Sequence, residues 1–508
     1  MRTARTFDVA DLYRGPVAEP VATSADVDLD EKLRQAYFWI VNTAIISPHY
    51  DIELEDGPSP SYEFGDAKAR ITLPSGQSYS SFVLMPLLTF AVHGRCLFVG
   101  GPGRGKTASA LLMGVIAGYP AREVRRAMQH GHPQMTTSDL LGTPLPADLL
   151  KAEKTSDIRI AWRRWLSMRI RIVDEYNRIP TRTQSALLTV LGDGYAEMLD
   201  QMLECPPAAW FLTANDDLGG GTYPVIEALR DRIDVVVQAL AFNSRFLATL
   251  LERVEEGYRP EDVVPAEVIF SPEQFEALRS RVLAVELPAD VERRVGYFAS
   301  QLEFLDQAAD ILEYKSKDTA RLSGVDVHLV AAADTGRDRL RDLGAQTRNG
   351  LSVRALMTIL TYAKAMAWFR GNDRVALDDV RHVLPFVLRG RLMPDLDAPF
   401  FDQPGNERFR FDTIGWLRHL FDASCAEYDQ LDLDRDDPVG AMQAEFSTGL
   451  AGVTEADVRE RLVRIERLLA DWSRGHKLYG TVYDDVVALK YLHQRYTNYL
   501  AWLTWHQG

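Results

Sequence analysis

Residues 97–109 read LFVGGPGRGKTAS. The apolar run at 96–99 predicts a buried strand, and the pattern at 108–113 predicts a helix. Residues 100–107, which lie between them, match the pattern G-x-x-x-x-G-K-T. In such a loop, glycines let backbone N–H groups wrap around phosphate groups at the start of a helix. The stretch therefore predicts a phosphate-binding loop between a strand and a helix.

The loop also contains side chains suited to a nucleoside triphosphate. Lys106 is expected to reach the β- and γ-phosphates, and the hydroxyl of Thr107 is expected to ligate Mg²⁺. The residues expected to bind the nucleotide from this loop are Gly101, Pro102, Gly103, Arg104, Gly105, Lys106, Thr107 and Ala108.

The composition is typical of a soluble globular protein. The 508 residues allow roughly two to four domains, and 46% of them are apolar. The net charge of −15 argues against a general affinity for nucleic acid or anionic membranes. The three cysteines lack metal-ligand spacing, and the longest apolar run, at 82–92, is too short to cross a bilayer. We expect a cytoplasmic protein with no membrane span.

Strand-like and helical patterns alternate over residues 81–245. After the strand that precedes the loop, further strands are predicted at 169–173, 210–213 and 234–237, with helical patterns between them. Strands separated by helices indicate βαβ units. The expected fold is therefore α/β, with a parallel sheet covered on both faces.

Three regions flank this core. Residues 1–80 are expected to form a loose leader, a helix at 31–48 and short hairpins. Residues 246–392 carry helical patterns and are expected to form an all-helical domain, in which the charged stretch 305–348 is interpreted as an insertion. Residues 393–508 begin as a linker rich in proline and aspartate and continue as a C-terminal helical extension.

Two adjacent carboxylates follow the strand predicted at 169–173. Asp174 is expected to hold Mg²⁺, partly through water, and Glu175 to polarise the water that attacks the γ-phosphate. The strand at 210–213 is followed closely by an amide, that of Asn215. If this strand lies between the other two, Asn215 reaches the γ-phosphate and the water from the side. A capping or turn role explains this asparagine locally just as well.

The order of these motifs resembles that of the AAA+ ATPases of the MoxR family. Seven segments match in order: 100–107 (GGPGRGKT), 137–142 (TSDLLG), 174–188 (DEYNRIP, then QSALL), 213–215 (TAN), 221–224 (GTYP), 227–232 (EALRDR) and 351–355 (LSVRA). The resemblance covers about residues 85–392. It implies an AAA+ αβα P-loop core, an all-α lid, and ATP hydrolysis by a homohexameric ring whose sites lie between subunits.

The resemblance also implies roles for single residues. Asn215 would be the first sensor of the nucleotide, and Arg354 in the lid would be the second. Arg232, at the family's Asp-Arg position, is the expected arginine finger for the neighbouring subunit, and Arg230 is the alternative. Outside this motif order, a solvated helix face explains such arginines. The predicted function is remodelling or activation of an unknown client protein, including metal or cofactor insertion, with a partner that carries a von Willebrand factor A domain.

The segment 163–171 (RRWLSMRIR) departs from the family pattern. Basic and aromatic residues near a ring pore could grip an acidic polypeptide or a nucleic acid. This keeps open a second function, a nucleic-acid-stimulated motor of restriction or defence type. The acidic net charge favours instead ion pairs between subunits in an inserted hairpin. A scaffold that binds nucleotide without turnover is disfavoured because Asp174 and Glu175 are both present.

Some local patterns have structural interpretations. Ser271 with Gln274, and Thr454 with Asp457, predict helix starts. The segment 130–132 (HGH) lacks further ligands and is interpreted as a loop. Aromatic residues near the C-terminus recur at roughly helical spacing, which indicates a core or a subunit interface. They are Tyr491, Tyr496, Tyr499, Trp502 and Trp505.

Overall fold

The chain divides into two units. A computed structural model describes residues 28–65, 69–149, 154, 157–215, 227–327, 342–433, 437–475, 478 and 480–507. The first unit comprises residues 1–287 and 357–390, and the second comprises residues 288–356 and 391–508. The predicted leader, up to residue 27, and the GTYP segment at 221–224 lie outside the described residues. The domain boundaries expected from the sequence stay a prediction.

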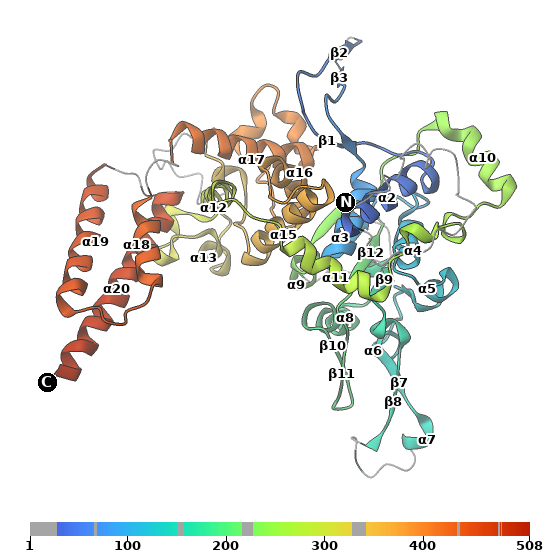
Figure 1. Ribbon diagram of the computed structural model, residues 1–508, viewed down its shortest axis with the longest axis horizontal. Helices are drawn as coiled ribbons and strands as arrows, with labels where there is room; N and C mark the ends of the chain where they lie inside the picture. Colours follow the sequence, from blue (N-terminus) through green and yellow to red (C-terminus); the bar gives the residue numbers. More distant parts are fainter. Residues whose placement is uncertain are drawn as a thin grey trace, which may run out of the picture. The chain divides into compact units, whose positions relative to one another are not determined.

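A five-stranded parallel sheet lies at the centre of the first unit (Figure 1). In sheet order the strands are β13 (Val235–Gln238), β5 (Arg95–Val99), β12 (Ala209–Ala214), β9 (Ile170–Asp174) and β6 (Gln129–His130). All four neighbouring pairs are parallel. The four strands predicted from apolar runs are present, and the two-residue β6 is additional. The predicted α/β fold with a parallel sheet is confirmed.

Helices and short hairpins surround this sheet. The described α-helices of the first unit are α2 (Leu29–Trp39), α3 (Ser81–Val92), α4 (Lys106–Ile116), α5 (Ala121–Ala127), α6 (Thr137–Leu141), α7 (Pro146–Leu149), α8 (Thr181–Asp193), α9 (Glu227–Asp231), α10 (Leu247–Glu256), α11 (Pro272–Leu283) and α16 (Leu377–Leu388). Helix α15 (Val353–Phe369) begins in the second unit and ends in the first. The paired hairpins are β1–β4 (Ile52–Glu53, Ser78–Tyr79), β2–β3 (Ser61–Phe64, Ala69–Thr72), β7–β8 (Gly142–Pro144, Ile160–Trp162) and β10–β11 (Tyr195–Met198, Gln201–Glu204).

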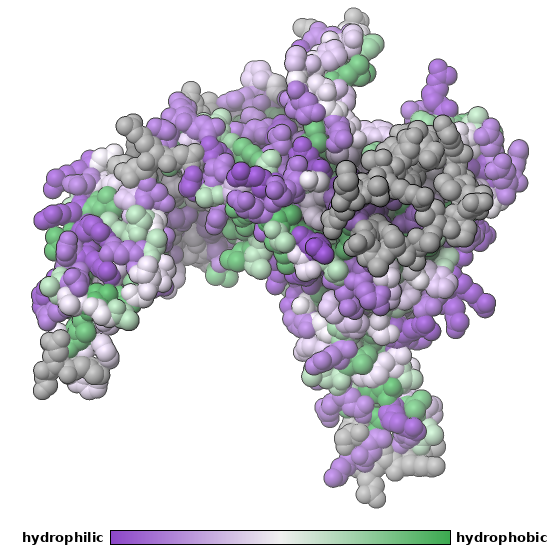
Figure 2. Space-filling view, in the orientation of Figure 1, coloured by the Kyte–Doolittle hydropathy of each residue, from purple (hydrophilic) through white to green (hydrophobic). Residues whose placement is uncertain are grey.

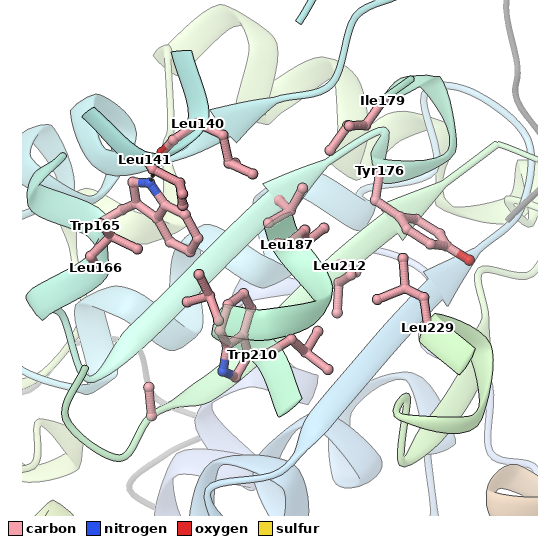
Figure 3. Packing of buried hydrophobic residues seen from close by; sticks show 14 of the residues in the cluster. Leu140, Leu141, Trp165, Leu166, Tyr176, Ile179, Leu187, Trp210, Leu212 and Leu229 are labelled. Atoms are coloured by element: carbon pink, nitrogen blue, oxygen red, sulfur yellow. Dashed lines mark hydrogen bonds between the residues drawn. The ribbon is translucent and has the colours of Figure 1, made fainter. Parts of the chain in front are cut away.

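Both faces of the sheet are covered, and for this reason its strands read as continuous apolar runs. Side chains alternate across a strand, so neighbouring residues enter different clusters. Leu212 of β12 packs in one cluster with Leu187 of α8 (Figure 3). On the other face Phe211 stacks on Phe98 of β5, and Phe98 meets Phe82 of α3 edge to face. All six residues of β12 are buried, which makes it the core strand of the sheet.

The hairpins β7–β8 and β10–β11 extend side by side from one end of this unit (Figure 1). The amide of Gln201 donates a hydrogen bond to the carbonyl of Ile158, which connects the two hairpins. At the turn of β10–β11, Leu199 and Asp200 have φ of 49° and 60°, and Met202 is exposed. Figure 2 shows hydrophobic residues, in green, among hydrophilic ones on this protrusion.

The arginines of segment 163–171 are used inside the chain. Arg171 is buried in β9, donates to two backbone carbonyls at 2.7 and 2.8 Å and lies over the ring of Trp210. Burial lowers the pKa of Arg171 to about 10. Arg169 lies over Tyr119 in the same way. Arg163 donates a hydrogen bond to the carbonyl of Asp139, and Arg164 donates one to the carboxylate of Glu123. Two of the four guanidinium groups are thus withdrawn from any nucleic-acid surface.

Helices dominate the described part of the second unit. They are α12 (Ala289–Glu303), α13 (Lys317–Leu322), the first turn of α15, α17 (Thr413–Gln430), α18 (Pro438–Ser447), α19 (Glu455–Gly475) and α20 (Thr481–Gln507). Phe298 of α12 meets Phe421 of α17 edge to face, and α18, α19 and α20 share a separate apolar cluster. The predicted all-α lid and C-terminal helices are confirmed. Among the described helices of the whole chain, none is both long and apolar enough to cross a bilayer.

Candidate active site

The loop at 100–105 connects β5 to α4. Gly100, Gly103 and Gly105 have φ of 139°, 72° and 78°, values that residues with a side chain rarely adopt. A Cβ at Gly100 would also lie 2.9 Å from the carbonyl oxygen of Ala239. The glycine pattern seen in the sequence is therefore required by the backbone of this loop.

Lys106 is the first residue of α4 and is only 6% exposed. Its ammonium group donates hydrogen bonds to the carbonyls of Gly100 and Gly101 and, at 2.8 Å, to Oδ1 of Asn215. A buried ammonium requires such oxygen partners, and phosphate oxygens are equivalent acceptors. Because β12 lies between β5 and β9, the condition for Asn215 to reach this point from the end of β12 is met.

Asp174 ends β9 beside the same loop. Its Oδ1 accepts hydrogen bonds from the hydroxyls of Thr107, at 2.8 Å, and Thr213, at 2.6 Å. Carboxylate and hydroxyl oxygens are ligand types that Mg²⁺ prefers, so this pair fits the cation. No group of three or more His, Cys, Asp or Glu within the described ranges could hold a metal ion. A cation at this pair would therefore depend on phosphate oxygens and water for its remaining ligands.

Glu175 has a left-handed backbone, with φ of 53° and ψ of 47°. For a residue with a side chain this conformation costs about 1–3 kcal/mol. Its N–H donates to the hydroxyl of Thr213 at 2.9 Å, and its Oε1 accepts from the amide of Asn215 at 2.9 Å. Its Oε2 lies 3.1 Å from the guanidinium of Arg178. The carboxylate is therefore held from two sides.

Sequence reasoning missed three of these groups. Thr213 belongs to a matched motif but has no predicted role, although a threonine in an apolar strand two residues before Asn215 is a usable signal. Arg178 likewise had no role. The segment 130–132 was interpreted as a loop, but His130 belongs to β6, and its Nδ1 lies 3.4 Å from Asp174. A strand of two residues has no periodicity by which to detect it.

The three predicted arginines lie on other elements. Arg232 follows α9, donates to the carbonyl of Leu188 in α8 at 2.7 Å and lies 3.6 Å from Asp193. Arg230 is exposed on α9. Arg354 is in the first turn of α15, within the second unit. Their predicted roles involve a nucleotide or a neighbouring subunit and stay predictions.

A cavity of about 70 Å³ lies beside the loop within the first unit. Arg104 of the loop, Gln238 at the end of β13, Ala239 and Phe82 of α3 contribute to its lining. Arg104 also donates to the carbonyl of Ala239 at 3.1 Å, which joins the loop to the residue after β13.

The chain is similar to known proteins in its lid region and over a longer stretch of its sequence. Residues 343–410 match a family model described as an AAA lid domain. Over 312 residues the chain is 24% identical to Chaperone MoxR1 of Mycobacterium tuberculosis, which amounts to 60% of this chain and 69% of that protein. Both matches support the resemblance of the chain to the MoxR family of AAA+ ATPases. The family resemblance seen in its motifs is thereby confirmed.

One solved structure similar to this chain is that of a predicted ATPase from Cytophaga hutchinsonii. The match has a TM-score of 0.46 and 20% sequence identity, and it covers 66% of this chain and 89% of that one. The match to the AAA lid family ends at residue 410, so most of the C-terminal extension lies outside the matched region.

Proposed function

We propose that this protein, like the MoxR-type AAA+ ATPases it resembles, binds ATP with Mg²⁺ and hydrolyses it at the site formed by the ends of β5, β9 and β12. The observation that carries the proposal is a continuous set of contacts from Lys106 through Asn215 to Glu175, with the Thr107–Asp174 pair beside it. These contacts connect the loop suited to phosphates with a carboxylate suited to orienting water.

Each side chain has a defined part in this proposal. Lys106 would exchange its carbonyl partners for the β- and γ-phosphates, and Thr107 with Asp174 would hold Mg²⁺, partly through water. When bound, the cation neutralises charge on the phosphates. Glu175 would accept a proton from the attacking water, while Asn215 fixes the direction of its carboxylate. The base of the nucleotide would lie toward the cavity lined by Arg104.

We also propose that the protein works as a homohexameric ring with a finger from Arg232 or Arg230 and a lid sensor at Arg354. The support is the family resemblance together with an exposed apolar face on α10. None of the residues of α10 is buried, and Leu247, Leu251 and Val254 recur on one side of this helix. Apolar faces of this kind mark interaction sites.

The work done by the ring is proposed to be remodelling or activation of a client protein. The curated relative is named a chaperone, and exposed Leu149 of α7 and Leu199 and Met202 of the β10–β11 hairpin offer apolar contacts to a polypeptide. A partner with a von Willebrand factor A domain and a cytoplasmic location belong to the same proposal. For the nucleic-acid motor, the basic segment was the main support, and two of its arginines are used internally.

Two substitutions separate nucleotide binding from hydrolysis. Lys106→Ala should abolish binding of a fluorescent ATP analogue, because it removes the cation that meets the phosphates. Glu175→Gln should bind the analogue normally and release phosphate about 100-fold or more slowly, since the amide cannot accept the proton. Glu197→Gln, at the exposed position of strand β10, is the matched control.

Phosphate release by Glu175→Gln at the parent rate would show that the assigned base is wrong. The same variant, loaded with ATP, tests the remodelling role as bait for a purified von Willebrand factor A partner. We expect the Glu175→Gln variant to retain the partner and the Lys106→Ala variant not to retain it. Equal retention of the partner by both variants would contradict an ATP-dependent interaction.

A further inference from the structure

Helix α20, the longest helix in the described chain, has two different faces. With α18 and α19 it forms a three-helix group within the second unit (Figure 1). Leu489, Leu492 and Tyr496 are buried in the apolar cluster that the three helices share. The remaining face of α20 is exposed to solvent and is rich in aromatic residues.

Four residues define this aromatic stripe: Tyr491, Arg495, Trp502 and Trp505. Their spacing of four, seven and three places them on one side of a helix. The exposed fractions of Tyr491, Trp502 and Trp505 are 43%, 49% and 79%. From the first to the last residue the stripe extends for about 21 Å, roughly four helical turns.

One end of the stripe enters a groove between α18 and α20 with a volume of about 300 Å³. Phe446 of α18 and Ala488, Tyr491 and Leu492 of α20 give the groove apolar walls. Phe446 is held in place by an edge-to-face contact with Tyr496, at 5.3 Å between ring centroids. The groove is therefore a formed surface feature with aromatic walls.

Among the described residues that line this groove, Arg495 is the single charged one. Its guanidinium lies 5.4 Å from the centroid of the Phe446 ring, and no described residue forms an ion pair with it. Exposed Tyr and Trp beside an unpaired Arg are the residue types that dominate binding energy at protein interfaces. Charge complementarity then calls for a carboxylate in whatever occupies the groove.

We propose that the aromatic stripe and its groove bind an amphipathic helix of a partner protein. Apolar side chains of that helix fill the groove and pack along Trp502 and Trp505, and one of its acidic side chains pairs with Arg495. The length of the stripe suits a helix of about four turns, in the manner of helix-in-groove recognition. The C-terminal extension thus serves to recruit a partner, a role separate from the nucleotide site.

Two other occupants fit the observations less well. If the stripes of two copies paired, the interface would contain two Arg495 side chains and no carboxylate from either stripe. The two positive charges would then repel each other. Membrane-surface helices are rich in basic residues on their polar face, whereas the stripe has a single cation.

The test selects helices from a displayed library of random 16-residue peptides on the full-length protein. Peptides that bind a Trp502→Lys variant are removed first. Enriched peptides should carry apolar residues spaced by three or four and at least one Asp or Glu. Measured by fluorescence anisotropy, their affinity should fall about tenfold or more for Trp502→Ala and for Arg495→Glu. A peptide whose acidic residue is changed to Lys should recover binding to Arg495→Glu.

Thr497→Lys lies on α20 outside the stripe and should bind as the parent does, and circular dichroism melts confirm that each variant folds. Absence of enrichment over the Trp502→Lys variant, or equal binding by Arg495→Glu, overturns the proposal. It is also overturned if Trp502→Ala lowers the oligomer mass in light scattering, which indicates a second copy. Loss of co-sedimentation with phosphatidylcholine–phosphatidylserine vesicles in that variant, which indicates lipid, overturns it as well.

Discussion

Thr213 shows how a single hydroxyl can organise the candidate site. It is 1% exposed, and it both donates to Asp174 and accepts from the N–H of Glu175. Glu175 adopts a left-handed backbone at this point, and the hydrogen bond from its N–H compensates part of that strain. One side chain in the central strand thus positions both carboxylates that the sequence had predicted as functional.

Replacing Thr213 by Val should therefore impair hydrolysis more than it impairs folding. The substitution preserves shape but leaves the N–H of Glu175 without its partner, at a cost of about 1–3 kcal/mol, and removes one of the two hydroxyls that donate to Oδ1 of Asp174. Phosphate release should slow about tenfold or more. Thr213→Ser, which retains the hydroxyl, should remain close to the parent rate. Equal rates for the Val and Ser variants would show that the hydroxyl has no such role.

At the level of elements, the sequence predicted those with a strong local signal. The four apolar strands could be predicted because a strand buried on both faces is a continuous apolar run in the sequence. The capping boxes at Ser271 and Thr454 are formed as predicted, and each begins a helix. Helix starts of this kind are encoded within four residues, so they are readable without tertiary information.

Elements that depend on long-range contacts were not predicted. Strand β6 exists because it pairs with β9, and Gly131 next to it is needed because a Cβ there would lie 2.3 Å from the carbonyl oxygen of Glu175. In the candidate site, Lys106, Asp174, Glu175 and Asn215 were identified from motifs. Partners such as Arg178 were not, because side-chain pairing is decided by the packed structure.

Helix α20 contains a carboxyl group that should make stability depend on pH. Burial and the nearby carboxylates of Asp437 and Asp484 raise the pKa of Asp485 from 3.8 to about 6. An acid whose pKa is higher in the folded than in the unfolded chain stabilises the fold below its unfolded pKa. This contribution is lost as the pH rises through about 6. Above that pH the ionised Asp485 opposes folding of the α18–α20 group.

Asp485→Asn should therefore raise the melting temperature of this group by about 2–4 °C at pH 8. The difference from the parent should shrink as the pH falls from 6 to 4, where both side chains are neutral. Thermal melts by circular dichroism over this pH range provide the measurement. A difference independent of pH would mean that Asp485 titrates normally in the folded protein.

At the scale of the proposed assembly, Arg232 and Arg230 are the two candidates for the arginine finger. Arg232 is tied to α8 through the carbonyl of Leu188 and lies near Asp193, whereas Arg230 is exposed on α9. The ion pair of Arg232 with the half-exposed Asp193 contributes about 0–1 kcal/mol, so release of the side chain costs mainly its hydrogen bond to the Leu188 carbonyl. Arg232 is still favoured as the finger because it occupies the family's Asp-Arg position. Arg230 is the alternative because its side chain is exposed and could reach a neighbouring subunit.

Mixing subunits distinguishes the two arginines. Arg232→Ala should bind ATP but release phosphate about 10³-fold more slowly, as expected for loss of a finger. Adding Lys106→Ala subunits should partly restore the rate, because they supply Arg232 to sites whose loop still contains Lys106. Arg230→Ala should hydrolyse ATP at close to the parent rate. If rescue occurs with Arg230→Ala instead, the finger is Arg230. If neither variant is rescued in rings shown to mix, each site is complete within one subunit, because a residue acting across an interface must be replaceable by a neighbour.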